Sequence, residues 1–350
     1  RFARFAWVVL AFNLPVILWG AYVRISFSGD GCGANWPLCG GGQVIPRAMS
    51  TPRLIEFTHR AMTSADTLLI LTLLVWAFLA FPKRNCVRRY ASLSMLFLLI
   101  EALLGAGLVL LRLVAHNASW ARALYLSAHL TNTMLLLAAL TATAWAALRN
   151  KAKSSIFDAP RSVLAGVVIA VVVSVTGAIA ALGDTLFPAS SIAGGLAQDF
   201  SSTSSMLLRL RVFHPAVAIA GAIYLVWMSA QFLRRPDGDP AKSAATRVLS
   251  LTLFQLAVGA VNITLLAPIW MQLTHLLIAD IVWIAIVVLL FETQVQRPGE
   301  LDDFDSSGST TTRADHSAPA NTIMVPMNDQ RMMLMDWTNG GTSLRSLFRR

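Results

Sequence analysis

The residues of this chain best suited to metal chemistry are histidines. Six occur among 350 residues, and four of them, His59, His129, His214 and His275, lie in long apolar segments, near one end of each. A single histidine in such a segment is often a hydrogen-bonded packing residue. Four at matching places are different, because two imidazoles from facing helices of a bundle can hold one haem iron between them. The pattern therefore predicts two bis-histidine haem sites.

A copper or zinc site is the alternative interpretation of these histidines. Zinc usually takes three or four protein ligands, and no third cysteine, histidine or carboxylate recurs at matching places in the sequence. His116 and His316 have no counterpart at all, and we interpret both as surface residues.

The two halves of the chain look like copies of one another. Four features recur at separations of 146 to 157 residues: His59 with His214, His129 with His275, the segment from Glu101 with that from Gln255, and Gly20-Ala21 with Gly177-Ala178. An even number of membrane crossings keeps a second copy in the same orientation. The separations predict two tandemly repeated four-helix bundles, each with one pair of histidines.

One acidic residue breaks this symmetry. Glu56 lies one helical turn before His59, on the same face. It either forms an ion pair with Arg60 or acts as a catalytic base. The matching position, 155 residues on, is Arg211, so only the first half carries the acid. We infer that one haem is chemically changed and the other is not.

Other charged residues lie close to these positions. Arg60 and Arg122 are near the first pair of histidines, and Arg209 and Arg211 are near the second. Arginine binds carboxylates with a bidentate fork, so each could hold a haem propionate; each could equally extend to lipid headgroups. Glu101 is costly in lipid and is expected to face the bundle interior.

The elements that must position these residues are membrane helices. The chain is 56% hydrophobic and 13% charged, with a mean hydropathy of +0.62. A helix needs about 20 apolar residues to cross the hydrocarbon of a bilayer. Eight such runs occur, at 5–25, 54–81, 91–115, 121–147, 162–182, 208–233, 248–269 and 271–293. The predicted fold class is all-α integral membrane, with eight transmembrane helices.

Charge distribution predicts the orientation of these helices. Fourteen lysines and arginines lie on one side of the predicted membrane and five on the other. By the positive-inside rule both termini are cytoplasmic, and the histidines lie near the outward ends. The net charge of +10 is explained by topology, so nucleic acid is not expected as a partner.

Two of the three cysteines lie in the first outward loop. Cys32 and Cys39 are close in sequence there, and an oxidising compartment would permit a disulfide. Two unrelated thiols and a metal site remain the alternatives. Cys86 lies in a predicted cytoplasmic loop and is interpreted as an ordinary thiol.

The sequence predicts three regions. Residues 1–150 form the bundle with the substrate haem, and residues 151–296 form the bundle with a permanent haem. Residues 297–350 are predicted to be a disordered cytoplasmic tail, within which 324–337 could form a short helix.

Several elements of the chain together resemble the haem A synthase family of terminal-oxidase assembly factors. They are Gly20-Ala-Tyr-Val-Arg24 followed by Gly31-Cys32, then Asn35-Trp-Pro-Leu-Cys39, then Glu56-Phe-Thr-His59-Arg60, with His129, His214 and His275 in order. The resemblance covers about residues 5 to 293. The polar tail and the serine-rich outward loop of the second half depart from it.

The resemblance implies an oxidoreductase of the cell membrane, expected to be bacterial, that converts the C8 methyl of haem O to a formyl group. It implies that His59 and His129 flank the substrate haem with Arg60 beside it. His214 and His275 would ligate a permanent haem b, Glu56 would be catalytic, and Cys32 and Cys39 would form a redox-active disulfide. The implied partners are haem O synthase as donor, an electron-transfer partner and the machinery of terminal oxidase assembly.

Two other classes of protein fit parts of the pattern. A di-haem b-type electron carrier would need equivalent sites in both halves, which Glu56 opposite Arg211 argues against. A transporter built from repeats would have helices broken at mid-membrane, whereas the histidines lie near the outward ends.

Overall fold

The structure is a computed structural model of the chain. It describes residues 1–39, 50–151, 154–201 and 205–294, and three short segments between 322 and 346. Residues 1–295 form one compact helical unit, and the segment from 296 forms a second unit.

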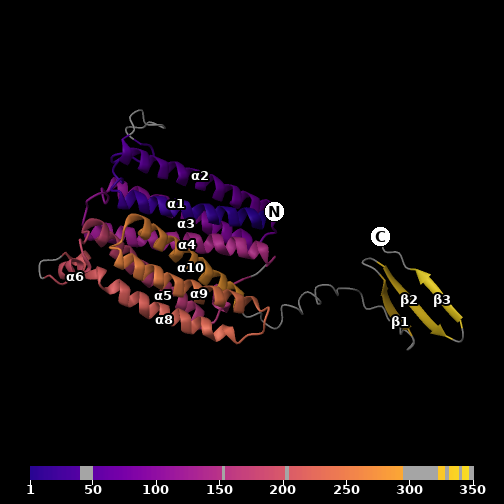
Figure 1. The fold of residues 1–350 in the computed structure, drawn as a ribbon. Coiled ribbons are helices and arrows are strands. Elements are labelled where there is room, and N and C mark those ends of the chain that lie inside the picture. Colours follow the sequence, from indigo (N-terminus) through magenta and orange to yellow (C-terminus); the bar gives the residue numbers. More distant parts are fainter. Residues whose placement is uncertain are drawn as a thin grey trace. The chain divides into compact units, whose positions relative to one another are not determined.

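Long helices make up the first unit (Figure 1). In order they are α1 (Phe2–Ile25), α2 (Thr51–Ala80), α3 (Cys86–Leu110), α4 (Trp120–Leu148), α5 (Arg161–Leu186), α8 (Phe213–Leu233), α9 (Pro240–Thr264) and α10 (Ile269–Glu292). Three short helices accompany them: η1 (Ile156–Asp158), α6 (Ile192–Phe200) and α7 (Met206–Arg211). Within the described residues, eight helices are long and apolar enough to cross a membrane, which confirms the predicted fold class.

Two helices, α3 and α9, begin five and eight residues earlier in the chain than their apolar runs suggest. The side chain of Asn85 accepts a hydrogen bond from the backbone of Val87 at the start of α3, and Asp239 accepts one from Ala241 at the start of α9. These caps satisfy backbone N–H groups that a helix start leaves unpaired. The capped first turns are polar, so hydropathy alone does not detect them.

A proline interrupts the sixth membrane crossing near its start. Pro215 has no N–H to donate to the carbonyl of Arg211, so the helix cannot continue regularly there. The chain accordingly ends α7 at Arg211 and begins α8 at Phe213. The break places Arg211 and His214 on either side of a change in helix geometry.

The long helices pack as two rings of four. In the first, α1 contacts α2, α2 contacts α3, α3 contacts α4, and α4 returns to α1. In the second, α5, α8, α9 and α10 make the same cycle of contacts. Helices α4 and α1 pack against α10, and α4 also packs against α5. A buried hydrogen bond of 2.8 Å from Trp283 Nε1 to the carbonyl of Met134 joins α10 to α4.

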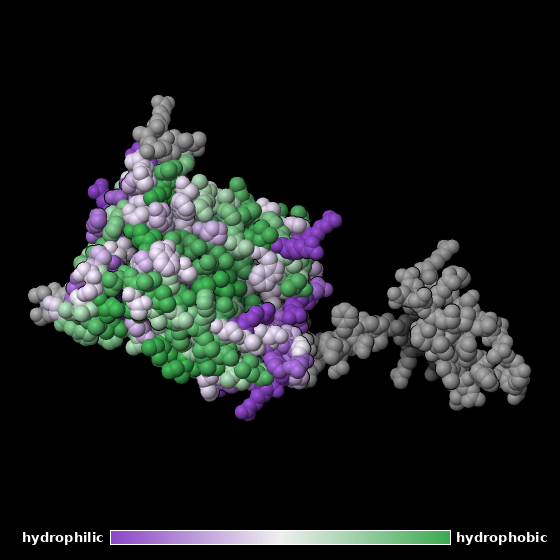
Figure 2. All heavy atoms as spheres, viewed as in Figure 1, coloured by the Kyte–Doolittle hydropathy of each residue, from purple (hydrophilic) through white to green (hydrophobic). Residues whose placement is uncertain are grey.

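The outer surface of the helical unit is apolar. Leu68, Leu103 and Ile223 are each 66% exposed, and Figure 2 shows apolar side chains across the middle of the visible face, with polar ones toward both ends. Such a surface would be unfavourable in water but is satisfied by hydrocarbon.

The second unit contains a three-stranded antiparallel sheet, β1 (Thr322–Met327), β2 (Arg331–Thr338) and β3 (Gly341–Ser346), in the order β1-β2-β3. The sequence predicted disorder here and allowed a short helix over 324–337, but these segments are strands. The overlooked signal was Asn339-Gly340, a dipeptide typical of two-residue hairpin loops, which follows the apolar segment 332–335. The rest of 297–350 lies outside the described residues.

Close packing of α5 on α8 gives a stability prediction. A Cβ added to Gly221 would lie 2.6 Å from Cγ2 of Val173. Gly221→Val should therefore lower the free energy of unfolding by about 1 to 3 kcal/mol through overpacking. The matched control is Ala220→Val, because Ala220 is exposed on the same helix. Thermal unfolding in detergent measures both, and equal stabilities would contradict the packing.

Candidate functional site

All four membrane histidines lie near the same end of the helical unit. His59 is in α2, His129 in α4, His214 in α8 and His275 in α10. These helices alternate with the others along the chain and run in one direction, and each histidine lies within the first ten residues of its helix. The predicted placement at helix starts is therefore confirmed.

The histidines divide between the two rings of helices. His59 on α2 and His129 on α4 belong to the first ring, and His214 on α8 and His275 on α10 belong to the second.

Each imidazole lies against a glycine of a neighbouring helix. A Cβ added to Gly20 would lie 2.9 Å from Cε1 of His59, and one added to Gly177 would lie 3.0 Å from Cε1 of His214. Gly259 is equally close to His275, at 3.1 Å, and Gly105 lies opposite Nε2 of His129, at 3.7 Å. The glycines recurring in the sequence are thus the positions at which helices leave room for the rings.

Three of the rings have polar partners that orient them. Nδ1 of His129 lies 2.7 Å from Glu101 Oε1, and Nδ1 of His214 lies 3.1 Å from Thr176 Oγ1. A partner at Nδ1 leaves Nε2 available to a metal and fixes the plane of the ring. Gln255, which matches Glu101 in sequence, contacts His275 through its side-chain amide. Nδ1 of His59 is buried and has no partner in the part of the chain that the structure describes.

Glu101 is held firmly between α3 and α4. Besides His129 it accepts hydrogen bonds from Asn132 and Thr133. The expectation that this carboxylate faces the bundle interior is confirmed, and its charge is distributed over three donors.

Glu56 is buried, with 3% of its surface exposed. Its Oε1 lies 2.6 Å from Nη2 of Arg60, and its Oε2 accepts a hydrogen bond of 2.8 Å from the backbone N–H of Cys32. The ion pair with Arg60 is therefore present. It does not exclude a catalytic role, because the pairing holds the carboxylate in a fixed position.

A disulfide joins Cys32 to Cys39, which decides between the three interpretations of these cysteines. Nη1 of Arg60 donates to the carbonyls of Asn35, Pro37 and Leu38 within the loop that the disulfide closes. Arg60 thus binds Glu56 with one amino group and this loop with the other. The sequence predicted Arg60 as a haem-binding residue; its recorded hydrogen bonds go to these protein groups.

Gly31 allows the loop to lie directly on α2. A Cβ at this position would lie 2.5 Å from the backbone of Pro52, closer than any side chain permits. The carbonyl of Gly31 accepts a hydrogen bond from Arg53 Nε, and the next residue is Cys32, which binds Glu56.

The second half reverses the charges found around Glu56. Arg211, at the position matching Glu56, lies 2.6 Å from Asp199 and 3.1 Å from Asp184. Sequence reasoning missed both aspartates, because they lie outside the apolar runs, Asp184 at the end of α5 and Asp199 in the short helix α6. Asp184 reaches Arg211 because α5 packs against α7, and Asp199 does so because α6 packs against α7.

The remaining arginines mainly hold backbone in place. Arg122 is 2% exposed and donates to the carbonyls of Ala115 and Asn117. Arg24, in the segment that follows Gly20, donates to the carbonyl of Ala181 at 2.7 Å and so links α1 to α5. His116, expected to be a surface residue, stacks on Phe27 with ring centroids 4.3 Å apart. His316 lies outside the described residues.

The described residues contain no cluster of three or more histidines, cysteines or acids able to hold a bare metal ion. The fold defines a multi-pass integral membrane protein with two histidines in each ring of helices, all four near the same end of the helical unit.

Comparison with known proteins identifies the family. The model of the COX15-CtaA family, described as cytochrome oxidase assembly protein, matches residues 3–287. The chain belongs to this family. Segments of it are also similar to proteins named Heme A synthase: 38% identical over 110 residues to that of Exiguobacterium sp. (strain AT1b), which is 31% of this chain and 36% of that protein. The chain is also 43% identical over 94 residues to the Heme A synthase of Exiguobacterium sibiricum. This match covers 27% of this chain and 31% of that protein.

A longer similarity is to a protein with a different name. The chain is 41% identical over 294 residues to a Protoheme IX farnesyltransferase of Thermus thermophilus, which covers 83% of this chain and 48% of the relative. The chain therefore spans about half the length of that protein.

Thiol mapping tests the loop beside Glu56. After denaturation without reductant, a maleimide should modify one cysteine per chain, the buried Cys86, because Cys32 and Cys39 are joined. With reductant it should modify all three. In the control Cys86→Ser, no modification is expected before reduction. Three reactive thiols in unreduced wild-type protein would contradict the disulfide.

Proposed function

We propose that this protein is an oxidoreductase that converts the C8 methyl of haem O to a formyl group, the reaction of a haem A synthase. The observation that carries the proposal is Glu56: it is buried one turn from His59, with both oxygens held, while Arg211 stands at the matching position of the second half. Family membership and the similarity to proteins named Heme A synthase support the reaction.

His59 and His129 are proposed to flank the substrate haem, and His214 and His275 to ligate a permanent haem b. The fit of a haem is supported by the glycines facing the rings and by the partners at Nδ1 of His129 and His214. The buried Nδ1 of His59 lacks such a partner among the described residues, which suits a ring whose position depends on a substrate that comes and goes. Haem b would supply a carrier for the electrons removed from the substrate.

The two sites are proposed to have arisen as tandem copies of one four-helix bundle, over 1–150 and 151–296. Both rings of helices make the same cycle of contacts. The same kinds of glycine face the histidines in both, on α1 and α5 and on α3 and α9. This agreement favours the same architecture in both rings of helices, with the chemical difference at Glu56 and Arg211.

Glu56 is proposed to act as the base that accepts protons as the methyl carbon is oxidised, or to stabilise positive charge that develops there. Arg60 and the N–H of Cys32 hold the carboxylate in a fixed position, so little reorganisation is needed when charge develops. A site among membrane helices strengthens such electrostatic effects, because few water molecules compete with them. Water would supply the oxygen atom of the formyl group, and the displaced hydrogens would leave as protons and electrons. The electrons require an external acceptor, which is the proposed electron-transfer partner.

The long relatives suggest where the substrate comes from. About half of the Thermus farnesyltransferase lies outside the match. We propose that a prenyl-transferring haem O synthase hands its product to the site at His59 within the bilayer, and that the product serves terminal oxidase assembly. Both termini are proposed to be cytoplasmic, with the sites near the outer surface of the membrane.

Glu56→Gln tests the role of the acid. The amide keeps the size of the side chain and one acceptor oxygen but cannot take up a proton. Thermal stability should fall, because breaking the buried pair with Arg60 costs about 3 to 5 kcal/mol. Haem content should stay near that of the wild type, while conversion of haem O per bound haem should fall roughly a hundredfold or more. Pigments extracted from cells that also produce haem O synthase would be separated and quantified.

The control for this variant is Glu292→Gln, which removes a carboxylate paired with Arg149 in the same way, away from the histidines. It should leave conversion unchanged. If Glu56 only neutralises Arg60, its variant should lose haem as well as stability, and conversion should fall only in proportion to the haem that is lost. A Glu56→Gln protein that makes haem A at the normal rate would contradict the catalytic assignment.

A further inference from the structure

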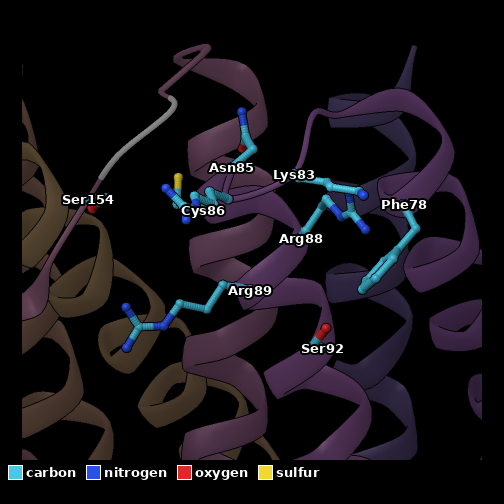
Figure 3. A pocket seen from close by; sticks show the side chains of 9 residues that line it. Phe78, Lys83, Asn85, Cys86, Arg88, Arg89, Ser92 and Ser154 are labelled. Carbon is cyan, nitrogen blue, oxygen red and sulfur yellow. The ribbon is translucent and has the colours of Figure 1, made fainter.

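A basic pocket lies at the end of the helical unit away from the histidines. It has a volume of about 460 Å³ and is formed where α2 ends and α3 begins (Figure 3). Glu56 and the pocket residue Phe78 are 22 residues apart on α2, which corresponds to roughly 33 Å along a helix. The pocket is therefore separate from the proposed catalytic site.

Four cationic side chains line this pocket: Lys83, Arg84, Arg88 and Arg89. Figure 3 shows Lys83 and Arg88 extending toward the same space beside Phe78, with Arg89 leaving α3 in another direction. Cζ of Arg88 lies 4.1 Å from the centroid of the Phe78 ring, so a cation–π contact holds its guanidinium in place.

These cations have no carboxylate partner within the described part of the chain. Three other cations at the same end of the unit do have one. Arg149 binds Glu292, Arg235 binds Asp239 and Lys242 binds Asp237. The hydrogen bond from Lys242 holds the pKa of Asp237 below its ordinary value, so this pair is charged at neutral pH. The pocket thus concentrates positive charge that the protein itself leaves uncompensated.

An apolar strip on α2 leads away from the pocket. Val75, Phe78 and Leu79 are 50%, 47% and 82% exposed, and residues three and four apart share one face of a helix. This face points outward at the level where the membrane-spanning helices end, which is where lipid headgroups meet acyl chains. A free phosphate would use the cations but not the strip.

We propose that this pocket binds an anionic phospholipid, with its phosphate at Lys83 and Arg88 and an acyl chain along Val75, Phe78 and Leu79. The guanidinium of Arg88 offers two parallel donors to phosphate oxygens, and Asn85 and Ser92 line the same pocket with further polar groups. Basic pockets between membrane helices bind anionic headgroups in this way. The bound lipid would compensate the charge and fill the junction of α2 and α3.

Native mass spectrometry of the full-length protein tests the proposal. The protein would be released from micelles that contain equal amounts of phosphatidylglycerol and phosphatidylcholine. The wild type should retain phosphatidylglycerol in preference to phosphatidylcholine. Lys83→Gln combined with Arg88→Gln should reduce this preference about fivefold or more.

The matched control is Arg234→Gln combined with Arg247→Gln, which removes the same charge at the same end of the unit and should keep the preference. Arg88→Lys preserves the net charge but loses the planar fork of the guanidinium. It should weaken retention of phosphatidylglycerol about two- to fivefold, and it keeps the proposal testable if the double variant folds poorly. Equal retention of both lipids by the wild type, or equal loss in the control, would overturn the proposal. Complete displacement of phosphatidylglycerol by millimolar inorganic phosphate would also overturn it, since the ligand would then be a free anion.

Discussion

Hydrocarbon offers no hydrogen-bond partners, and this constraint shapes the whole helical unit. Backbone groups must be satisfied within each helix, so the chain crosses as long helices, and polar chemistry is confined to side chains that find partners inside the rings. Three of the four histidines, His129, His214 and His275, obey this rule at one end of the unit. All four lie against a glycine, and these three have a polar partner that orients the ring.

The same constraint gives the Glu56–Arg60 pair its significance. A buried carboxylate must be paired, and here the pairing also ties down the disulfide-closed loop, because Arg60 binds Asn35, Pro37 and Leu38 while the N–H of Cys32 binds Glu56. Loop, disulfide and acid therefore form one rigid cover over the start of α2. The second half builds its counterpart with opposite charges, around Arg211 and two aspartates.

The sequence was most informative about features that depend on neighbouring residues along the chain. Uninterrupted apolar runs predicted eight spans because crossing a bilayer requires them, and histidines and glycines at repeated separations predicted which helices face each other. Asp184 and Asp199 could not be foreseen as partners of Arg211, since α5 and α6 bring them to it only when both pack against α7. The hydrogen bonds from Arg60 to the loop carbonyls could not be predicted either, because every residue has a backbone carbonyl and the sequence does not indicate which ones accept. The polar first turns of α3 and α9 escaped a method based on hydropathy, and the strands of the second unit were hidden by an overall polar composition.

The central claim is that two similar haem sites differ in role, one holding a substrate and the other a permanent cofactor. The most direct measurement is separation of the pigments extracted from purified protein, produced together with haem O synthase, for the wild type and for His214→Ala combined with His275→Ala. The account predicts haem b together with haem O or haem A in the wild type, and selective loss of haem b in the variant. Haem b alone in the wild type, or an unchanged haem b content in the variant, would contradict it.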